Sequence, residues 1–212
     1  MRLLSVTLVL LVMCWGCATY NYKNLKQIES KTIDSSDLAP LFKNTSPAPL
    51  YKAEVSLYGK IFGGLLLIKY MPDSSYRIVF TTETAIKLFD FELKDEKFNV
   101  IYCIEKFNRD AVLNTIAGDI KLLLLENRIA QNASLLSDSE TNQLIYKFNA
   151  NENEVYYYKN TADKLLAKVE QAKGHKKKVV INLWEYKNTV PAHIKITHHN
   201  IRLKINLTLI ER

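Results

Sequence analysis

The chain has few of the residue types on which catalytic, metal-binding and disulfide-rich proteins depend. Its 212 residues include three cysteines, four histidines, six glycines and five prolines. His193, His198 and His199 have no cysteine or carboxylate at ligand spacing, so we expect no metal site. The sequence also lacks a Gly-rich phosphate loop and a Ser/His/Asp order. We therefore expect no enzymatic activity and no cofactor.

The apolar run at the N-terminus, residues 3–13, is too short to cross a bilayer, which takes about 20 apolar residues. It follows a basic start and precedes the sequence CWGC at 14–17, an arrangement typical of a secretory signal peptide. The small Gly16 directly before Cys17 resembles the bacterial lipobox. We expect 1–16 to be a lipoprotein signal peptide and Cys17 to be the lipid-attachment residue. The alternatives are an ordinary cleaved signal peptide and, less favoured, a single transmembrane anchor.

Acylation of Cys17 would hold the protein on a membrane through its lipid. Ala18 rather than Asp follows, and no acidic cluster comes after it. This pattern favours the periplasmic side of the outer membrane, although it does not exclude the cell surface. Cys103 would then be the remaining thiol, so no intramolecular disulfide can form. Cys103 ends an apolar run, and we expect a buried structural thiol rather than a nucleophile.

The basic residues of the chain outnumber the acidic ones and give a net charge of +7. This excess indicates either a solvated basic surface or attraction to anionic lipid headgroups. For Lys176, Lys177 and Lys178, with Lys173 and His175 beside them, the interpretations are a solvated turn or contact with anionic lipid or an acidic partner. We expect no nucleic-acid partner, because the chain is expected to be lipidated and periplasmic and does not interleave basic residues with aromatics on one face.

Composition and patterning predict one mainly β domain after a polar N-terminal segment. The 12 tyrosines and 8 phenylalanines favour strands. We expect 17–48 to contain the lipidated N-terminus, a polar tether and a short helix at 37–43, and 49–212 to form the domain. A helix at 108–127, capped by Asn108 or Asp110, is expected on the concave side of the sheet. The expected strands number about eleven: 51–58, 60–70, 76–82, 86–93, 98–104, 143–149, 154–159, 164–171, 177–186, 190–198 and 201–210.

Two of these strands carry the clearest resemblance to a known family. They read YRIVFT at 76–81 and KLFDFEL at 87–93. With the lipobox-like Cys17 and the mid-chain helix, they make the chain similar to the LolA/LolB superfamily, and to LolB-like outer-membrane lipoproteins in particular. The resemblance implies an incomplete antiparallel β-barrel of about eleven strands, closed by helices around an apolar cavity for acyl chains. It covers 51–212 at the level of layout.

The resemblance also implies function. The expected role is an outer-membrane-anchored lipoprotein that binds acyl chains of lipoproteins or other lipids and acts in lipoprotein reception or lipid transport. A periplasmic LolA-like carrier is a further expected partner. One departure concerns the loop after the Tyr-Arg strand, where LolB has an exposed leucine that helps to insert lipoproteins into the membrane. The matching residues 82–85 include no leucine, and Ile86 is the nearest apolar side chain.

A fatty chain needs a dry, elongated pocket, which the inward side chains of a half-barrel can supply. Because several runs are apolar on both faces, each candidate has plain core packing as its alternative. The alternative function is a non-catalytic anchored β-domain that serves as an accessory subunit of a cell-envelope complex. The candidate lining residues are Phe62, Leu65, Leu67, Ile78, Phe80, Leu88, Phe91, Ile101, Ile120, Leu124, Trp184 and Ile194.

Overall fold

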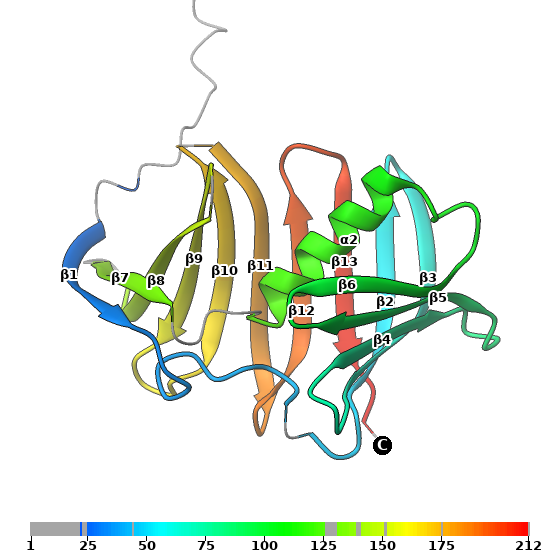
Figure 1. The fold of residues 1–212 in the computed structure, drawn as a ribbon, viewed down its shortest axis with the longest axis horizontal. Helices are drawn as coiled ribbons and strands as arrows, with labels where there is room; N and C mark the ends of the chain where they lie inside the picture. Colours follow the sequence, from blue (N-terminus) through cyan, green and yellow to red (C-terminus); the bar gives the residue numbers. More distant parts are fainter. Residues whose placement is uncertain are drawn as a thin grey trace, which may run out of the picture.

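The computed structural model describes residues 22, 25–43, 45–125, 131–138, 141–150, 152–174 and 176–211, which form one open, curved antiparallel sheet and one long helix (Figure 1). The 13-stranded sheet has the order β1-β7-β8-β9-β10-β11-β12-β13-β2-β3-β4-β5-β6. Its strands are β1 (Leu25–Thr32), β2 (Leu50–Leu57), β3 (Lys60–Tyr70), β4 (Tyr76–Thr81), β5 (Lys87–Lys94), β6 (Lys97–Cys103), β7 (Asn132–Asp138), β8 (Gln143–Ala150), β9 (Asn153–Asn160), β10 (Leu166–Lys173), β11 (Lys176–Lys187), β12 (Val190–His198) and β13 (Leu203–Leu209).

The mainly β architecture is confirmed as one open antiparallel sheet, whereas the count of about eleven strands is wrong. The expected closure by helices is also wrong, because the sheet stays open and one helix of the described residues lies across its concave face. The two missed strands pair with each other: β1 lies antiparallel to β7 at one edge of the sheet. No strand was expected at 132–138. The sequence of β1, LKQIESKT, favoured a polar tether because it has no apolar face, and β1 is exposed along most of its length. Its strand conformation depends on the backbone ladder with β7 rather than on an apolar face.

Part of the segment expected to be a polar tether is a strand of the sheet, and the expected helix at 37–43 is absent from the described residues. Residues 25–32 are part of the sheet, and 37–43 contain turns and irregular backbone. The apolar side chains of that stretch are nevertheless buried, with Leu38 and Phe42 each 2% exposed. Asp34 and Asp37 organise the turn together: the Asp34 carboxylate accepts hydrogen bonds from the backbone N–H groups of Ser36 and Asp37, and the Asp37 carboxylate accepts one from the backbone N–H of Asp34.

The helix α2 (Asp110–Leu123) lies across the concave face of the sheet, as expected (Figure 1). It begins after Arg109, whose side chain makes no capping bond, so neither Asn108 nor Asp110 caps it. Asp110 in its first turn and Lys121 in its last suit the helix dipole. The buried positions of the helix, Asp119, Leu122 and Leu123, fall in its C-terminal half.

Strands β4–β6 turn back over the concave side at the other end of the sheet, so that α2 lies within the curve (Figure 1). An aromatic ladder lines the inside of this return. The ring centroids of Phe80 and Phe89 are 5.2 Å apart, those of Phe89 and Phe91 4.4 Å, and those of Phe91 and Phe98 4.8 Å. Aromatic pairs at these separations add stabilisation beyond the area they bury. This end of the sheet is thus well packed on its inner face.

The candidate functional site

An elongated apolar cavity of about 320 Å³ lies between α2 and the concave face of the sheet. Its floor comes from β2, β3, β4, β5, β12 and β13, and α2 forms its roof. Charged groups are scarce in its wall: among the described residues, Asp119 is the one that lines it. The full lining is Ala53, Val55, Leu57, Tyr58, Phe62, Leu66, Ile68, Ile78, Phe80, Phe89, Phe107, Ala111, Val112, Thr115, Ile116, Asp119, Ile120, Leu123, Leu124, Ile196, Ile201, Leu203, Ile205 and Leu207.

The period of two along each strand explains which residues reach the cavity. In β3, Phe62, Leu66 and Ile68 point inward, and Gly64 occupies the inward position between them. A Cβ on Gly64 would lie 2.6 Å from the ring of Phe80, so only a glycine lets β4 approach this closely. Gly64 therefore shapes the cavity wall by letting β4 and the Phe80 ring lie close to the backbone of β3. The pairing of β3 with β2 keeps its register through 63–64, so the two glycines form no bulge against that strand.

The roof is held to the sheet near its C-terminal end. The hydroxyl of Tyr157, on β9, donates to the carbonyl oxygen of Leu122 at 3.4 Å. The carboxylate Oδ2 of Asp119 lies 2.9 Å from Nε2 of His198, at the end of β12. Both side chains of the Asp119–His198 pair are almost fully buried, at 6% and 4% exposed.

Burial raises the pKa of the Asp119 carboxyl above its ordinary value, because an apolar setting disfavours the charged form; the hydrogen bond from His198 opposes this shift. The pair joins a helix residue to a strand residue 79 positions away. Sequence patterning did not single out either residue as part of a site. The signal was present in Asp119, a carboxylate among the apolar positions of the helix, but its partner is far away in the sequence.

Five of the candidate lining residues do line the cavity, at Phe62, Ile78, Phe80, Ile120 and Leu124. Whether they contact a ligand stays a prediction. The structure shows that the other seven do not line it, namely Leu65, Leu67, Leu88, Phe91, Ile101, Trp184 and Ile194.

The reasons for these corrections differ. Phe91 and Ile194 point inward but are packed into the core, at 0% and 1% exposed. Leu65 and Leu67 alternate with the inward residues of β3 and lie on its other face. Ile101, on the edge strand β6, is 51% exposed.

Two further residues of that set lie outside the cavity wall. Trp184 is 40% exposed and stacks on His193, with ring centroids 5.3 Å apart. Leu88 is half-buried and packs against the edge of the core. Apolar runs gave no means to separate these positions from true lining residues.

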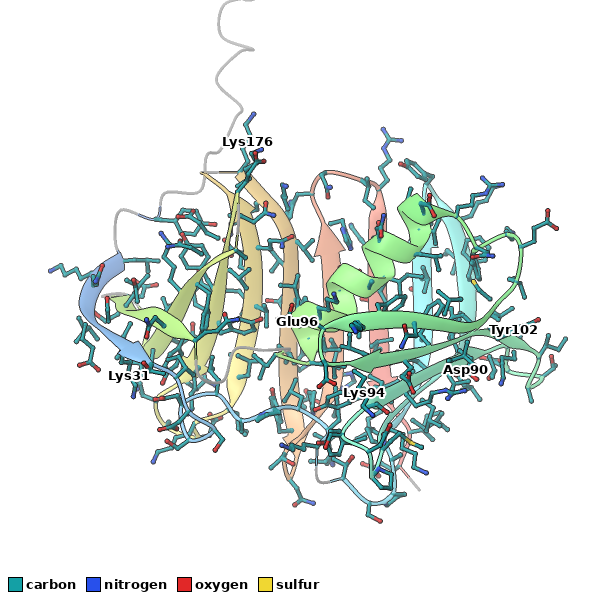
Figure 2. All side chains as sticks on the ribbon, viewed as in Figure 1. Lys31, Asp90, Lys94, Glu96, Tyr102 and Lys176 are labelled. Atoms are coloured by element: carbon teal, nitrogen blue, oxygen red, sulfur yellow. The ribbon has the colours of Figure 1, made fainter. Side chains whose placement is uncertain are left out.

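The loop between β4 and β5 presents an apolar side chain although it has no leucine. Ala85 closes a turn by donating its backbone N–H to the carbonyl oxygen of Thr82 at 3.0 Å, and Ile86 follows, 62% exposed. The side chains of Asp90 and Tyr102 lie near this end of β5 and β6, and those of Lys94 and Glu96 near the other (Figure 2). The loop thus exposes one large apolar side chain, that of Ile86.

The lysines near the β10–β11 hairpin are partly engaged by carboxylates. Lys177 lies 3.2 Å from the fully buried Glu170, and Lys173 pairs with Glu152. Lys176 is exposed at the hairpin (Figure 2). His175 lies outside the described residues. The hairpin therefore carries less free positive charge than its sequence indicates.

Across the part of the chain that the structure describes, no group of three or more His, Cys, Asp or Glu residues is placed to hold a metal ion. No described helix is long and apolar enough to cross a membrane. Cys103 is half-buried, and burial raises the pKa of its thiol. Cys14 and Cys17 lie outside the described residues.

No protein-family model matches the sequence, and no curated protein matches it significantly. Among solved structures, a LolA superfamily protein from Nitrosomonas europaea aligns with a TM-score of 0.52 at 10% identity, covering 80% of this chain and 87% of that chain. A structure described as an outer membrane lipoprotein-sorting protein domain, from Vibrio parahaemolyticus, has a TM-score of 0.44 at 9% identity, with coverages of 77% and 82%. A DUF1329 family protein from Desulfovibrio piger has a TM-score of 0.46 at 9% identity, with coverages of 79% and 85%.

The Nitrosomonas structure shows the fold. This chain has a LolA-like fold, as the two strands at 76–81 and 87–93 predict. At 10% identity the likeness concerns the fold alone.

Proposed function

We propose that this protein, with its LolA-like fold, binds a fatty acyl chain in the cavity beneath α2 and acts in the reception or transport of lipoproteins or other lipids. The observation that carries the proposal is the cavity itself, which is elongated, apolar and about 320 Å³ in volume. A water molecule takes up about 30 Å³ in the liquid, and a methylene group is of similar size. The cavity therefore accommodates about ten methylene groups. Burying them would contribute about 8 kcal/mol before the costs of association. The protein is proposed to act by binding, without catalysis.

The test compares two tryptophan variants on β2. Val55 is half-buried and lines the cavity, whereas its neighbour Ser56 points to the other face of the strand. Val55→Trp should fill the cavity, and Ser56→Trp adds the same side chain outside it. Both are made in a full chain carrying Cys17→Ser, which keeps every described residue and removes the proposed acylation site.

The binding of a fluorescent fatty acid should weaken at least tenfold in Val55→Trp and stay within about twofold of the parent in Ser56→Trp. Native mass spectrometry of the parent, purified without detergent, should show a bound amphiphile. The proposal fails if several preparations carry no lipid or lipoprotein and the fluorescent chain does not bind. It also fails if the two tryptophan variants bind equally well.

We further propose that Cys17 is acylated and holds the domain on the periplasmic side of the outer membrane. Tyr22, five residues later, stacks on Tyr156 with ring centroids 4.9 Å apart and donates a hydrogen bond to Glu170. A five-residue connection spans at most about 18 Å, so the acylated residue would hold β9 and β10 close to the bilayer. Cys17→Ser should move the protein from the membrane fraction to the soluble fraction and abolish incorporation of labelled palmitate. Unchanged fractionation would contradict the anchor.

A second function is favoured by one observation, the apolar edge strand β6. Val100, Ile101 and Tyr102 are 41%, 51% and 45% exposed, and β6 ends the sheet. An exposed apolar edge can accept a strand from another protein. In this case the domain would serve as an accessory subunit of an envelope complex. Ile101→Lys should then abolish capture of that partner while fatty-acid binding stays intact.

A further inference from the structure

Asp119 has a hydrogen-bonding capacity that its partner His198 does not exhaust. Its Oδ2 is engaged by Nε2 of His198 at 2.9 Å. Its second oxygen, Oδ1, has no hydrogen-bond partner among the residues that the structure describes. Oδ1 is also not among the fully buried side-chain atoms that lack a hydrogen-bond partner, so it keeps some accessible surface. Because Asp119 is 5% exposed overall and lines the cavity, the open side of Oδ1 is the cavity.

The other polar groups of the lining are a neutral hydroxyl, which is a weaker acceptor than a carboxylate, and a residue at the rim. The hydroxyl of Thr115 donates to the carbonyl oxygen of Ala111 at 2.8 Å, within the helix. Tyr58 is 66% exposed and lies at the turn between β2 and β3, at the rim. Asp119 is therefore the charged acceptor that an occupant meets inside the cavity, within the described part of the wall.

A carboxylate oxygen that faces an apolar space is costly unless a donor meets it. A plain hydrocarbon chain offers no donor, so its entry would bury Oδ1 against methylene groups. A chain with a hydroxyl or an amide N–H along its length would satisfy the atom. Sites that place a buried polar group opposite a substrate donor discriminate against analogues that lack it.

We infer that the cavity is built for a fatty chain that carries a hydrogen-bond donor, a hydroxyl or an amide N–H, which binds Oδ1 of Asp119. His198 positions the carboxylate by holding Oδ2. Asp119 follows Ala111, which lies at the exposed start of the helix, by eight residues, or about 12 Å along the axis. The donor thus sits within the cavity rather than at its mouth. This inference rests on the proposed binding of acyl chains.

The test measures selectivity rather than affinity alone. The assay is the displacement of a fluorescent fatty acid from the full chain carrying Cys17→Ser. The plain competitor is hexadecanoic acid. The donor-bearing competitors are hexadecanoic acids hydroxylated near the carboxyl end, in the middle or near the tail, and an N-acyl amide of the same length. At least one donor-bearing chain should bind about tenfold more tightly than the plain chain, the scale of one hydrogen bond to a charged group. The hydroxyl and amide probes separate the two possible sources of the donor.

Three variants assign the preference to Asp119. Asp119→Leu should abolish it while the plain chain still binds, and plain-chain binding also reports that the variant is folded. Asp119→Asn keeps one acceptor but removes the charge, so it should retain only part of the preference. Thr115→Val, on the same helix face, should reduce it far less than Asp119→Leu, because a neutral hydroxyl that donates to the backbone is a weaker acceptor than a carboxylate.

The inference is overturned if no donor-bearing chain exceeds the plain one, or if the preference survives Asp119→Leu. Plain-chain binding without selectivity would leave the proposed function standing and remove this inference alone. If neither plain nor donor-bearing chains bind, both are wrong.

Discussion

Gly64 is packed so closely that alanine at this position should destabilise the protein, whereas alanine at Gly63 should not. A Cβ on Gly64 would lie 2.6 Å from the Phe80 ring and still closer to the carbonyl oxygen of Thr81. A Cβ on Gly63 would meet only the carbonyl oxygen of Ala53, at 4.0 Å. The two glycines are adjacent in β3 and face opposite sides of the sheet, so they form a matched pair.

The magnitude follows from what can move. Thr81 is held in the ladder between β3 and β5, where it pairs with Leu65 and Lys87. Phe80 is 4% exposed and packs on the ring of Phe89. Neither neighbour can give way freely, so Gly64→Ala should cost about 2 kcal/mol, within the usual range for overpacking.

That cost corresponds to a melting temperature lower by about 4–8 °C for a domain of this size. Gly63→Ala removes chain entropy from the unfolded state and should be neutral or stabilising by up to about 1 kcal/mol. Thermal unfolding followed by circular dichroism, on chains carrying Cys17→Ser, measures both shifts. Because Phe80 lines the cavity, Gly64→Ala should also weaken fatty-acid binding. Equal melting temperatures for the two alanine variants would refute the packing argument.

Two further stability predictions concern buried carboxylates outside the cavity. Arg77 and Lys87 hold the pKa of Asp90 in the folded protein below its ordinary value of about 3.9. The ionised Asp90 therefore stabilises the fold at pH values above about 3.9. This contribution is lost as the pH falls through the lower pKa of the folded state. Asp90→Asn should therefore have a lower free energy of unfolding than the parent at pH 7. In urea unfolding at a series of pH values, this difference in free energy should shrink towards pH 3. A difference that does not change with pH would contradict the linkage. Glu170 is 0% exposed and 3.2 Å from Lys177, so Glu170→Gln should lower the free energy of unfolding by about 1–3 kcal/mol, and no change in the urea midpoint would show that the pair contributes nothing.

The strands that bury an apolar face were predictable from sequence, and the ones that do not were not. Strands such as β4, in which every second residue is buried, can be predicted from the pattern of apolar residues. Strand β1 has no such face, since Ile28, one of its two large apolar residues, is 56% exposed. Its pairing with β7 joins segments about 100 residues apart, as in the bond between the side chains of Thr32 and Asn132. Local pattern carries no information on such a partner.

The site was predictable as a type and only partly as a set of residues. Inward alternation favoured Ile78 and Phe80 correctly, because β4 is buried at every second position. It could not separate Phe91, packed against Phe89 and Phe98, from residues that border open space. Whether an inward side chain meets a neighbour or a cavity depends on the height of the helix above the sheet, which no residue encodes alone.

That height has a physical cause in the way α2 is held. Its C-terminal half is fixed to the sheet by the Asp119–His198 pair, by the bond from Tyr157 to the carbonyl of Leu122, and by the burial of Leu122 and Leu123. Its N-terminal half has no buried residue, and Val112 and Ile116 border the cavity instead of filling it. An apolar face left partly unburied costs stability that an occupant can recover. The same polar pair that fixes the helix also leaves one carboxylate oxygen toward the space beneath it, so attachment of the roof and selection of the occupant depend on one residue, Asp119.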